Sequence, residues 1–254
     1  MNNYSKVLLD CIDREKAGFD YTCSDHDRNI LNIMFKEINI TLNTNFHYIA
    51  EIDSFNIVGA GPIMVKYIHQ FDTESIRAYL TPQLVSDKVV GVERLVIDLY
   101  RKFKTSPVYI SPADKSSPAH IYARYDTAIR KLKPRKYKND LVELVNTPRD
   151  VFYLPMTAQM IASWRLPEFK DLLFYCAREG GITFEDVGLP NDNRSYYPSL
   201  EGMERQLKFI AIISLKYYPT SEVLDFISSF LDTNDLDLSA CAKKSIAYIS
   251  KRLI

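Results

Sequence analysis

Apolar side chains recur with the period of an α-helix along most of this 254-residue chain. In the clearest segments they occupy positions i, i+3, i+4 and i+7, which lie on one face of a helix. Glycine is scarce, at 8 residues, or about 3% of the chain against a usual level of about 7%. Because glycine supplies the positive-φ corners of tight hairpins and βα loops, its scarcity disfavours a sheet. The sequence therefore predicts an all-α fold of about 13 helices without strands.

The predicted helices are short, and proline marks many of their starts. Proline suits the first turn of a helix because its φ is fixed near the helical value and its missing N–H would have no partner there. The prolines at or just before an apolar repeat are Pro62, Pro134, Pro155, Pro167 and Pro219. The repeats themselves cover residues 4–12, 31–42, 64–71, 76–80, 92–103, 121–132, 137–145, 160–164, 169–176, 207–213, 223–230 and 238–253.

One predicted helix is apolar on nearly every side. Its residues Phe209, Ile210, Ile212 and Ile213 leave almost no polar face. A helix of this kind normally has neighbours in several directions. We therefore expect the helical pair at 201–231 to be a centre of stability and Ile213 to be buried.

Helical segments in the second half of the chain come in adjacent pairs. Each pair joins an apolar and aromatic helix end to an acidic first turn through a break of two or three residues, as at 161–168 and 215–222. About 38 residues separate the helix start near Leu200 from the one near Leu238, close to the roughly 40–47 residues of HEAT and armadillo repeats. In these features the chain resembles a HEAT-like α-solenoid.

The resemblance implies a right-handed α-α superhelix of HEAT/armadillo-like helical hairpins. It is clearest over residues 148–254. Regular spacing is missing from residues 1–60, which we expect to form an N-terminal helical cap or bundle. Residues 61–254 would then form the repeat region, in one continuous domain with the cap. Two stretches rich in proline, serine, glycine or asparagine predict loops near 106–118 and 180–198.

Charge is balanced over the whole chain, with 32 basic and 32 acidic residues. A net charge of zero removes the general electrostatic argument for binding nucleic acid or acidic membranes. One segment, 130–138, departs from this balance because six of its nine residues are basic. Such a cluster suits a solvated edge, an acidic protein partner or nucleic-acid phosphates, and the sequence leaves all three open. Its candidate binding residues are Lys131, Lys133, Arg135, Lys136 and Lys138.

Trp164 and Arg165 form the second candidate binding site, at a predicted helix end. Tryptophan and arginine are over-represented among the residues that dominate interface energy. The alternative is that Trp164 fills the core beside Met160 and Ile161, one helical turn earlier.

Residues with catalytic or ligand-binding chemistry do not form a familiar motif. The histidines have no metal-ligand spacing, and Cys11, Cys23, Cys176 and Cys241 include no CxxC pair, so we expect reduced thiols, no metal and no cofactor. The segment Gly59-Ala60-Gly61-Pro62 lacks the remaining residues of a phosphate-binding loop and predicts a turn before a helix. Asp25, His26 and Asp27 fit the acidic first turn of a helix better than an acid/base site. No catalytic residue is predicted.

The resemblance to helical-repeat proteins suggests a protein partner held along the concave side. We expect a non-catalytic scaffold or adaptor in the cytoplasm, with no membrane-spanning segment. A toxin-neutralising immunity protein is one alternative. Another is a nucleic-acid-binding protein, or an alkylpurine DNA glycosylase built from HEAT-like repeats, whose activity needs an aspartate among tryptophans and arginines. Here only Trp164 and Arg165 fit that pattern, and no aspartate matches it.

Overall fold

The computed structural model describes residues 24–47, 57–105, 118–183 and 199–253. All regular secondary structure in these ranges is helical, with twelve α-helices, two 3-10 helices and no strand. The prediction of an all-α fold is therefore confirmed for this part of the chain. The predicted helix at 4–12, Cys11, Cys23 and most of the two predicted loops lie outside the described residues.

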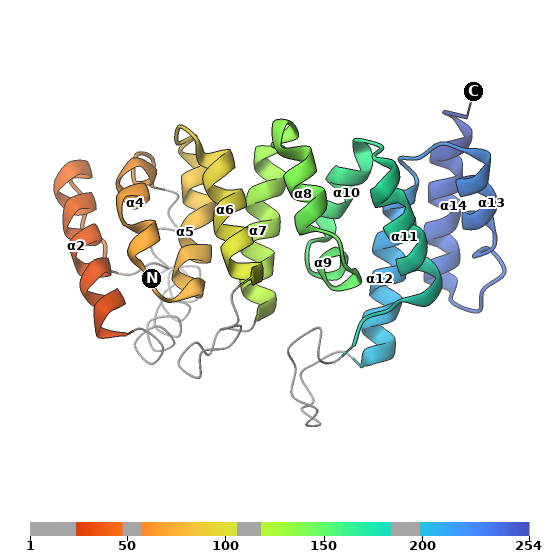
Figure 1. The fold of residues 1–254 in the computed structure, drawn as a ribbon, viewed down its shortest axis with the longest axis horizontal. Coiled ribbons are helices and arrows are strands. Elements are labelled where there is room, and N and C mark those ends of the chain that lie inside the picture. The colour runs from red at the N-terminus through yellow and green to blue at the C-terminus, as the bar shows by residue number, and fades with distance from the viewer. Residues whose placement is uncertain (1–23, 48–56, 106–117, 184–198, 254) are drawn as a thin grey trace, which may run out of the picture. The chain divides into compact units, whose positions relative to one another are not determined.

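The chain divides into two compact units, residues 1–132 and 133–254 (Figure 1). The first unit contains α2 (Asp25–Leu42), α4 (Gly61–Tyr67), the 3-10 helix η1 (Ile68–Gln70), α5 (Glu74–Ser86), α6 (Val92–Thr105) and α7 (Pro118–Leu132). Its core is aromatic where α6 meets α7: the rings of Phe103 and Tyr122 lie 5.1 Å apart, and those of Tyr100 and Tyr125 lie 5.5 Å apart. All four side chains are buried.

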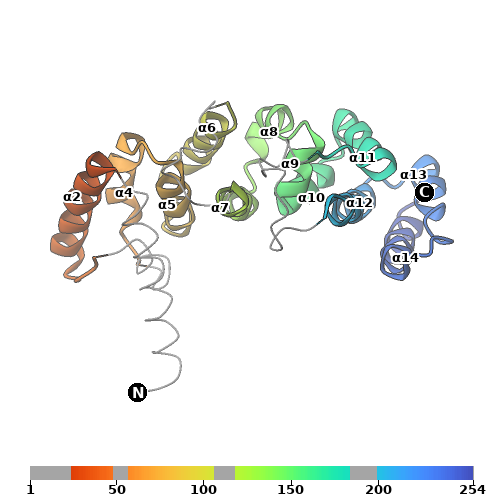
Figure 2. The ribbon, with the colours of Figure 1, turned by 90° about the horizontal axis from the view of Figure 1, so that it is seen from below.

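The second unit contains seven α-helices in two layers (Figure 2). They are α8 (Lys138–Leu144), α9 (Pro148–Tyr153), α10 (Pro155–Ser163), α11 (Pro167–Glu179), α12 (Leu200–Leu215), α13 (Ser221–Ser228) and α14 (Leu236–Ser250), with the 3-10 helix η2 (Arg135–Tyr137) before α8. Helices α8, α11 and α13 lie in one layer, and α10, α12 and α14 lie in the other. Within this arrangement α11 packs on α12, α13 packs on α14, and α12 lies between α10 and α14.

Helix starts follow the proline and capping pattern of the sequence. Pro155 and Pro167 are the first residues of α10 and α11. The Thr220 hydroxyl accepts the Val223 N–H at the start of α13. The sequence periodicity missed α9, because six residues are too few to show an apolar repeat. Its capping box was nevertheless readable, since Thr147 and the Asp150 carboxylate each accept the other's backbone N–H.

The glycine pair before α4 forms a turn, as the sequence predicts. The carboxylate of Asp87 accepts the Gly59 N–H at 3.2 Å and the Gly61 N–H at 2.6 Å. A carboxylate of the chain itself therefore occupies the place where a bound phosphate would have to lie. Gly59 has a φ of +96°, which explains its need for glycine.

Candidate functional site

Helix α12 has a core face and an opposite apolar face that is open to solvent. Its buried residues include Leu207, Ala211 and Ser214, which lie toward the other helices. At helical spacing on the opposite side stand Phe209 and Ile213, and both are only partly buried. The expectation that Ile213 would be buried is therefore wrong. The helix is apolar all round because one face packs in the core and the other lines a groove.

The groove runs between α12 and α14 and has a volume of about 430 Å³. This lies within the range of small-molecule and side-chain binding pockets, roughly 300–1,000 Å³. Helix α12 contributes Phe209, Ile213 and Lys216 at positions i, i+4 and i+7. The residues from α14 are Asp237, Ala240, Cys241, Lys244, Ser245 and Tyr248. Two nearly parallel rows of side chains thus form an apolar floor with charged ends.

The two helices are held side by side at the acidic end of the groove by Arg205. Its guanidinium bonds Asp235 at 2.5 and 2.8 Å and Asp237 at 2.9 Å. Asp235 also caps α14, because its carboxylate accepts the Leu238 N–H at 3.1 Å. The Arg205 hydrogen bonds and this cap lower the pKa of Asp235 to about 2. Asp237 also forms an ion pair with Arg205, and its side chain stays exposed.

The other end of the groove is basic and aromatic. The Lys216 ammonium lies 5.1 Å from the Tyr217 ring centre and 5.5 Å from that of Tyr248, and Arg252 covers Tyr248 at 3.7 Å. Among the described residues, neither Lys216 nor Lys244 has a carboxylate within ion-pair distance. Within the described part of the chain these two positive charges therefore lack an acidic partner.

The thiol of Cys241 lies in the groove wall between these lysines. Burial raises the pKa of Cys241, while the ammonium groups of Lys216 and Lys244 act in the opposite direction. Buried thiols of raised pKa are poor nucleophiles. The groove therefore offers contact surface and charge, without an activated nucleophile.

The structure places Trp164 at the C-terminal end of α10 and Arg165 just after it. Trp164 is partly exposed, whereas Met160 and Ile161 one turn earlier are buried. Arg165 is exposed and has a φ of +59°, where the chain turns into α11. The Trp164 side chain is thus neither fully buried in the core nor fully exposed to solvent.

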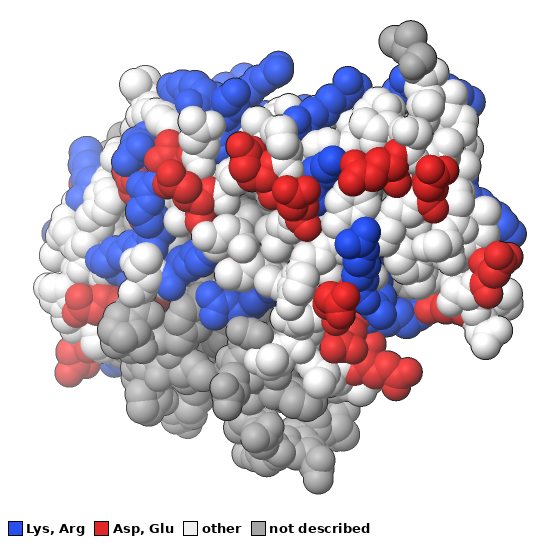
Figure 3. Space-filling view, turned by 45° about the vertical axis from the view of Figure 1, so that its right-hand side comes forward, with Lys and Arg blue, Asp and Glu red and all other residues white. Residues whose placement is uncertain are grey.

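The basic segment is exposed but divides between the two units. Lys131 lies in the last turn of α7, in the first unit. The other candidates belong to the second unit, around η2 and the start of α8: Lys133, Arg135, Lys136 and Lys138. All five side chains are exposed. On the face in Figure 3, basic and acidic side chains are interspersed.

Helix ends account for much of this charge pattern. In the second unit Glu168 and Glu222 occupy the first turns of α11 and α13, and Lys216 and Lys251 are the C-caps of α12 and α14. Negative charge near a helix N-terminus and positive charge near its C-terminus are favourable without any ligand.

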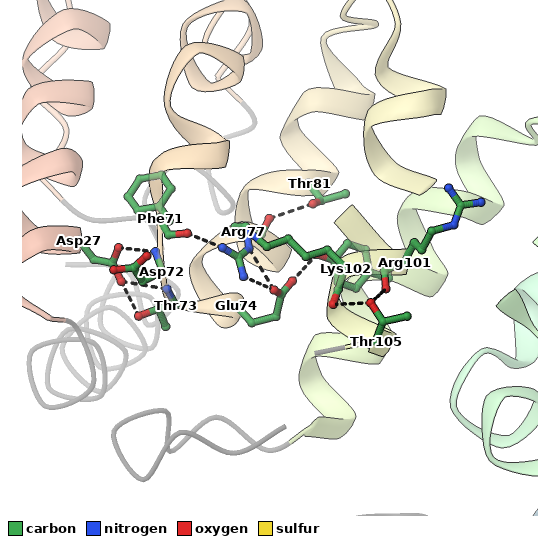
Figure 4. A network of polar contacts seen from close by, with 11 residues as sticks. Asp27, Phe71, Asp72, Thr73, Glu74, Arg77, Thr81, Arg101, Lys102 and Thr105 are labelled. Atoms are coloured by element: carbon green, nitrogen blue, oxygen red, sulfur yellow. Dashed lines mark hydrogen bonds and ion pairs between the residues drawn. The ribbon is translucent and has the colours of Figure 1, made fainter. Parts of the chain in front are cut away.

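One group of described residues brings possible metal ligands together, namely His26, Asp27 and Asp72, whose ligand atoms lie within 4.8 Å of one another. Asp27 is buried, and its carboxylate accepts the N–H groups of Asp72 and Thr73 at 2.8 and 3.0 Å (Figure 4). The Thr73 hydroxyl donates a further hydrogen bond to it. The carboxylate is committed to joining α2 to the start of α5, so we assign it a structural role. It is more than the local first-turn acid that the sequence predicted.

A second set of polar contacts begins at Glu74 and Arg77 of α5 (Figure 4) and includes Tyr125 of α7. Glu74 accepts hydrogen bonds from Arg77 and, at 2.6 Å, from the Tyr125 hydroxyl, and Arg77 also donates to the Phe71 carbonyl. Burial, followed by the nearby Glu74 charge, raises the pKa of Tyr125 well above its usual value. The polar groups of Glu74, Arg77 and Tyr125 pair with one another or with the backbone. We therefore assign this network a structural role in the first unit.

No protein-family model, curated protein or solved structure matches this chain. Within the described residues no helix combines the length and the apolar character needed to cross a bilayer. The site is therefore defined by geometry alone. Sequence reasoning missed Phe209, Lys216, Lys244 and Tyr248 as groove residues. The apolar character of α12 on nearly every side was a signal for Phe209, whereas no feature of the sequence pointed to the other three.

Proposed function

We propose that this chain is a non-catalytic HEAT-like helical-repeat protein that binds a protein partner. The observation that carries the proposal is the groove between α12 and α14. Its floor is apolar, whereas a helix face that contacts only water is normally polar. Phe209 and Ile213 keep part of their surface exposed, and a partner would remove that surface from water.

The helix pairs of the second unit support the repeat assignment. Helices α11 and α12 form one packed pair, α13 and α14 form the next, and α12 packs on α14. In a helical repeat protein each pair contacts its neighbours in this way, and the aligned helices of one layer present a continuous surface. The groove lies on one such layer, between α12 and α14.

The proposal is tested by affinity capture with the full chain as bait in nuclease-treated extract of its source cells, at low and at moderate salt. A captured protein is then purified and titrated against the bait by calorimetry. A saturable complex between the two purified proteins is the expected result. Capture of nucleic acid alone, or of no protein that rebinds in purified form, would reject protein binding.

The predicted residues at the edge of the second unit are tested in the same assay. A variant with Arg165, Lys133, Arg135, Lys136 and Lys138 changed to alanine is expected to bind more slowly and with a weaker dependence on salt, since rim charges act mainly on association rate. The matched control changes to alanine five exposed or partly exposed basic residues of the second unit outside this cluster, namely Arg178, Lys208, Lys243, Lys251 and Arg252. Equal association rates and salt dependence for the two variants would show that these basic residues are not part of the binding face.

A further inference from the structure

We infer that the groove between α12 and α14 receives a short acidic-amphipathic segment of the partner, with an apolar side chain on Phe209 and Ile213 and a carboxylate between Lys216 and Lys244. This inference rests on the proposed function and specifies the chemistry of its partner. It follows from the size, the floor and the charge distribution of the groove.

The length of the groove limits what it can hold. The α12 row from Phe209 to Lys216 covers seven helical steps, or about 10 Å, and the α14 row from Asp237 to Tyr248 covers eleven, or about 16 Å. These lengths match two to three turns of a partner helix or about three to five residues of an extended strand. The groove therefore fits a short linear segment with one or two apolar side chains.

The charges at the two ends set the polarity of that segment. At one end Lys216 and Lys244 have no acidic partner among the described residues, so a carboxylate entering there gains two charge-assisted contacts. At the other end the groove is lined by Asp237, whose side chain is exposed. A segment that carries its negative charge only beside the lysines gains these contacts and avoids repulsion from Asp237 at the other end.

The same distribution disfavours a nucleic acid. A phosphate backbone carries negative charge along its whole length, so it would meet the Asp237 carboxylate as well as the two lysines. The apolar floor of Phe209 and Ile213 also offers no hydrogen bond to a phosphate or sugar. An amphipathic peptide can cover the apolar floor and pair with the lysines at the same time, so the groove favours a protein segment.

The lysine pair at positions 243 and 244 provides an internal control. Both side chains are exposed and both lie in the same turn of α14, but only Lys244 lines the groove. The variants Lys244→Glu and Lys243→Glu therefore make the same change in net charge and in helix composition. Only the first places a negative charge where the partner carboxylate is expected.

The test begins with a random dodecapeptide library displayed against the full chain. We expect the enriched peptides to share a large apolar residue and, within one or two helical turns, an aspartate or glutamate. The best peptide is labelled and titrated by fluorescence anisotropy. Binding should weaken about tenfold or more in Lys244→Glu and by less than about twofold in Lys243→Glu, because unpaired like charge at a contact is costly and distant surface charge is screened. A peptide with lysine in place of its acidic residue should prefer Lys244→Glu over the unmodified chain.

Three results would overturn the inference: no enriched peptide, an enriched consensus without acidic residues, or equal affinities for the two variants. Thermal melts of both variants check that the fold is kept, which the exposure of both lysines favours. The captured partner separates the two proposals. If it binds Lys244→Glu and Lys243→Glu equally well, the groove assignment is wrong and protein binding stands. If no protein is captured, the proposed function itself fails.

Discussion

Replacing Ile212 and Ile213 separately by alanine tests whether α12 has one core face and one groove face. The two residues are adjacent and chemically identical, so effects on helix propensity and on the unfolded chain cancel in the comparison. Ile212 is completely buried, whereas Ile213 lines the open groove. The difference between the two variants therefore measures their surroundings.

The magnitudes follow from the burial of each side chain. Isoleucine to alanine removes three carbon atoms, worth about 0.8 kcal/mol each when buried. For Ile212 the cavity left behind adds to this loss, and we expect a cost of about 3–4 kcal/mol in unfolding free energy, within the range of core truncations. At Ile213 part of the side chain is already hydrated and no closed cavity forms. There we expect about 1–1.5 kcal/mol.

The assay is urea unfolding followed by the fluorescence of Trp164, the single tryptophan of the chain. Trp164 lies in the second unit with α12, so its signal reports the unit that carries the mutations. A fall in midpoint with an unchanged slope identifies a change in stability. Equal costs for the two variants, or a larger cost for Ile213→Ala, would show that the apolar stripe is core and that the groove is not a surface feature.

Three further changes test other parts of the structure. Tyr125→Phe should cost about 1.5–3 kcal/mol, because it deletes a buried hydroxyl that donates to the partly buried Glu74 carboxylate, and a cost below about 0.5 kcal/mol in urea unfolding would contradict that hydrogen bond. Gly61→Ala should destabilise the first unit by about 1–3 kcal/mol, since the new Cβ would lie 2.9 Å from the Cβ of Asp87, and a melting temperature equal to that of the unmodified chain would refute this packing. Burial raises the pKa of Cys176 from 9.0 to about 12, so the folded state holds that proton more tightly than the unfolded state. The stability contributed by this difference is complete below pH about 9 and is lost as the pH rises toward 12; native Cys176 should accordingly react with a disulfide reagent at pH 8 far more slowly than in urea, and equal rates would show that it is exposed.

The helices of this chain were largely predictable because their signals are local. The apolar period, the prolines at helix starts and the hydroxyl and carboxylate caps all act within one or two turns. The cap of α13 by Thr220 is an example, since donor and acceptor are three residues apart. Helix α9 was not predicted because periodicity was the main criterion, although the capping box of Thr147 and Asp150 is visible in the sequence.

The contacts that the sequence did not reveal are those between distant residues. Asp27 looks like an ordinary acid in the first turn of α2, yet its partners are 45 and 46 positions away, at the start of α5. Asp87 similarly caps the turn at Gly59 and Gly61 from 28 and 26 positions away. A side chain capable of capping its own helix can equally cap another, and local sequence does not distinguish the two.

The groove was hidden for a related reason. An apolar helix surface has the same composition whether it packs in the core or lines a binding groove, so the sequence of α12 predicted neighbours on several sides. The distinction depends on the number of neighbouring helices. Helix α12 packs on α9, α10, α11 and α14, yet Phe209 and Ile213 stay partly exposed where α12 and α14 form the groove.

Charge is more informative than apolar surface at this point, because the helix dipole explains some of the basic residues and not others. Lys216 and Lys251 are C-caps, and Arg165 directly follows one, so their positions are favourable without any partner. Lys244 lies more than one turn before the end of α14, where the dipole contributes little. It also has no carboxylate nearby among the described residues, and it faces an apolar floor. The inferred acidic segment would supply Lys244 with the counter-charge that the described residues do not.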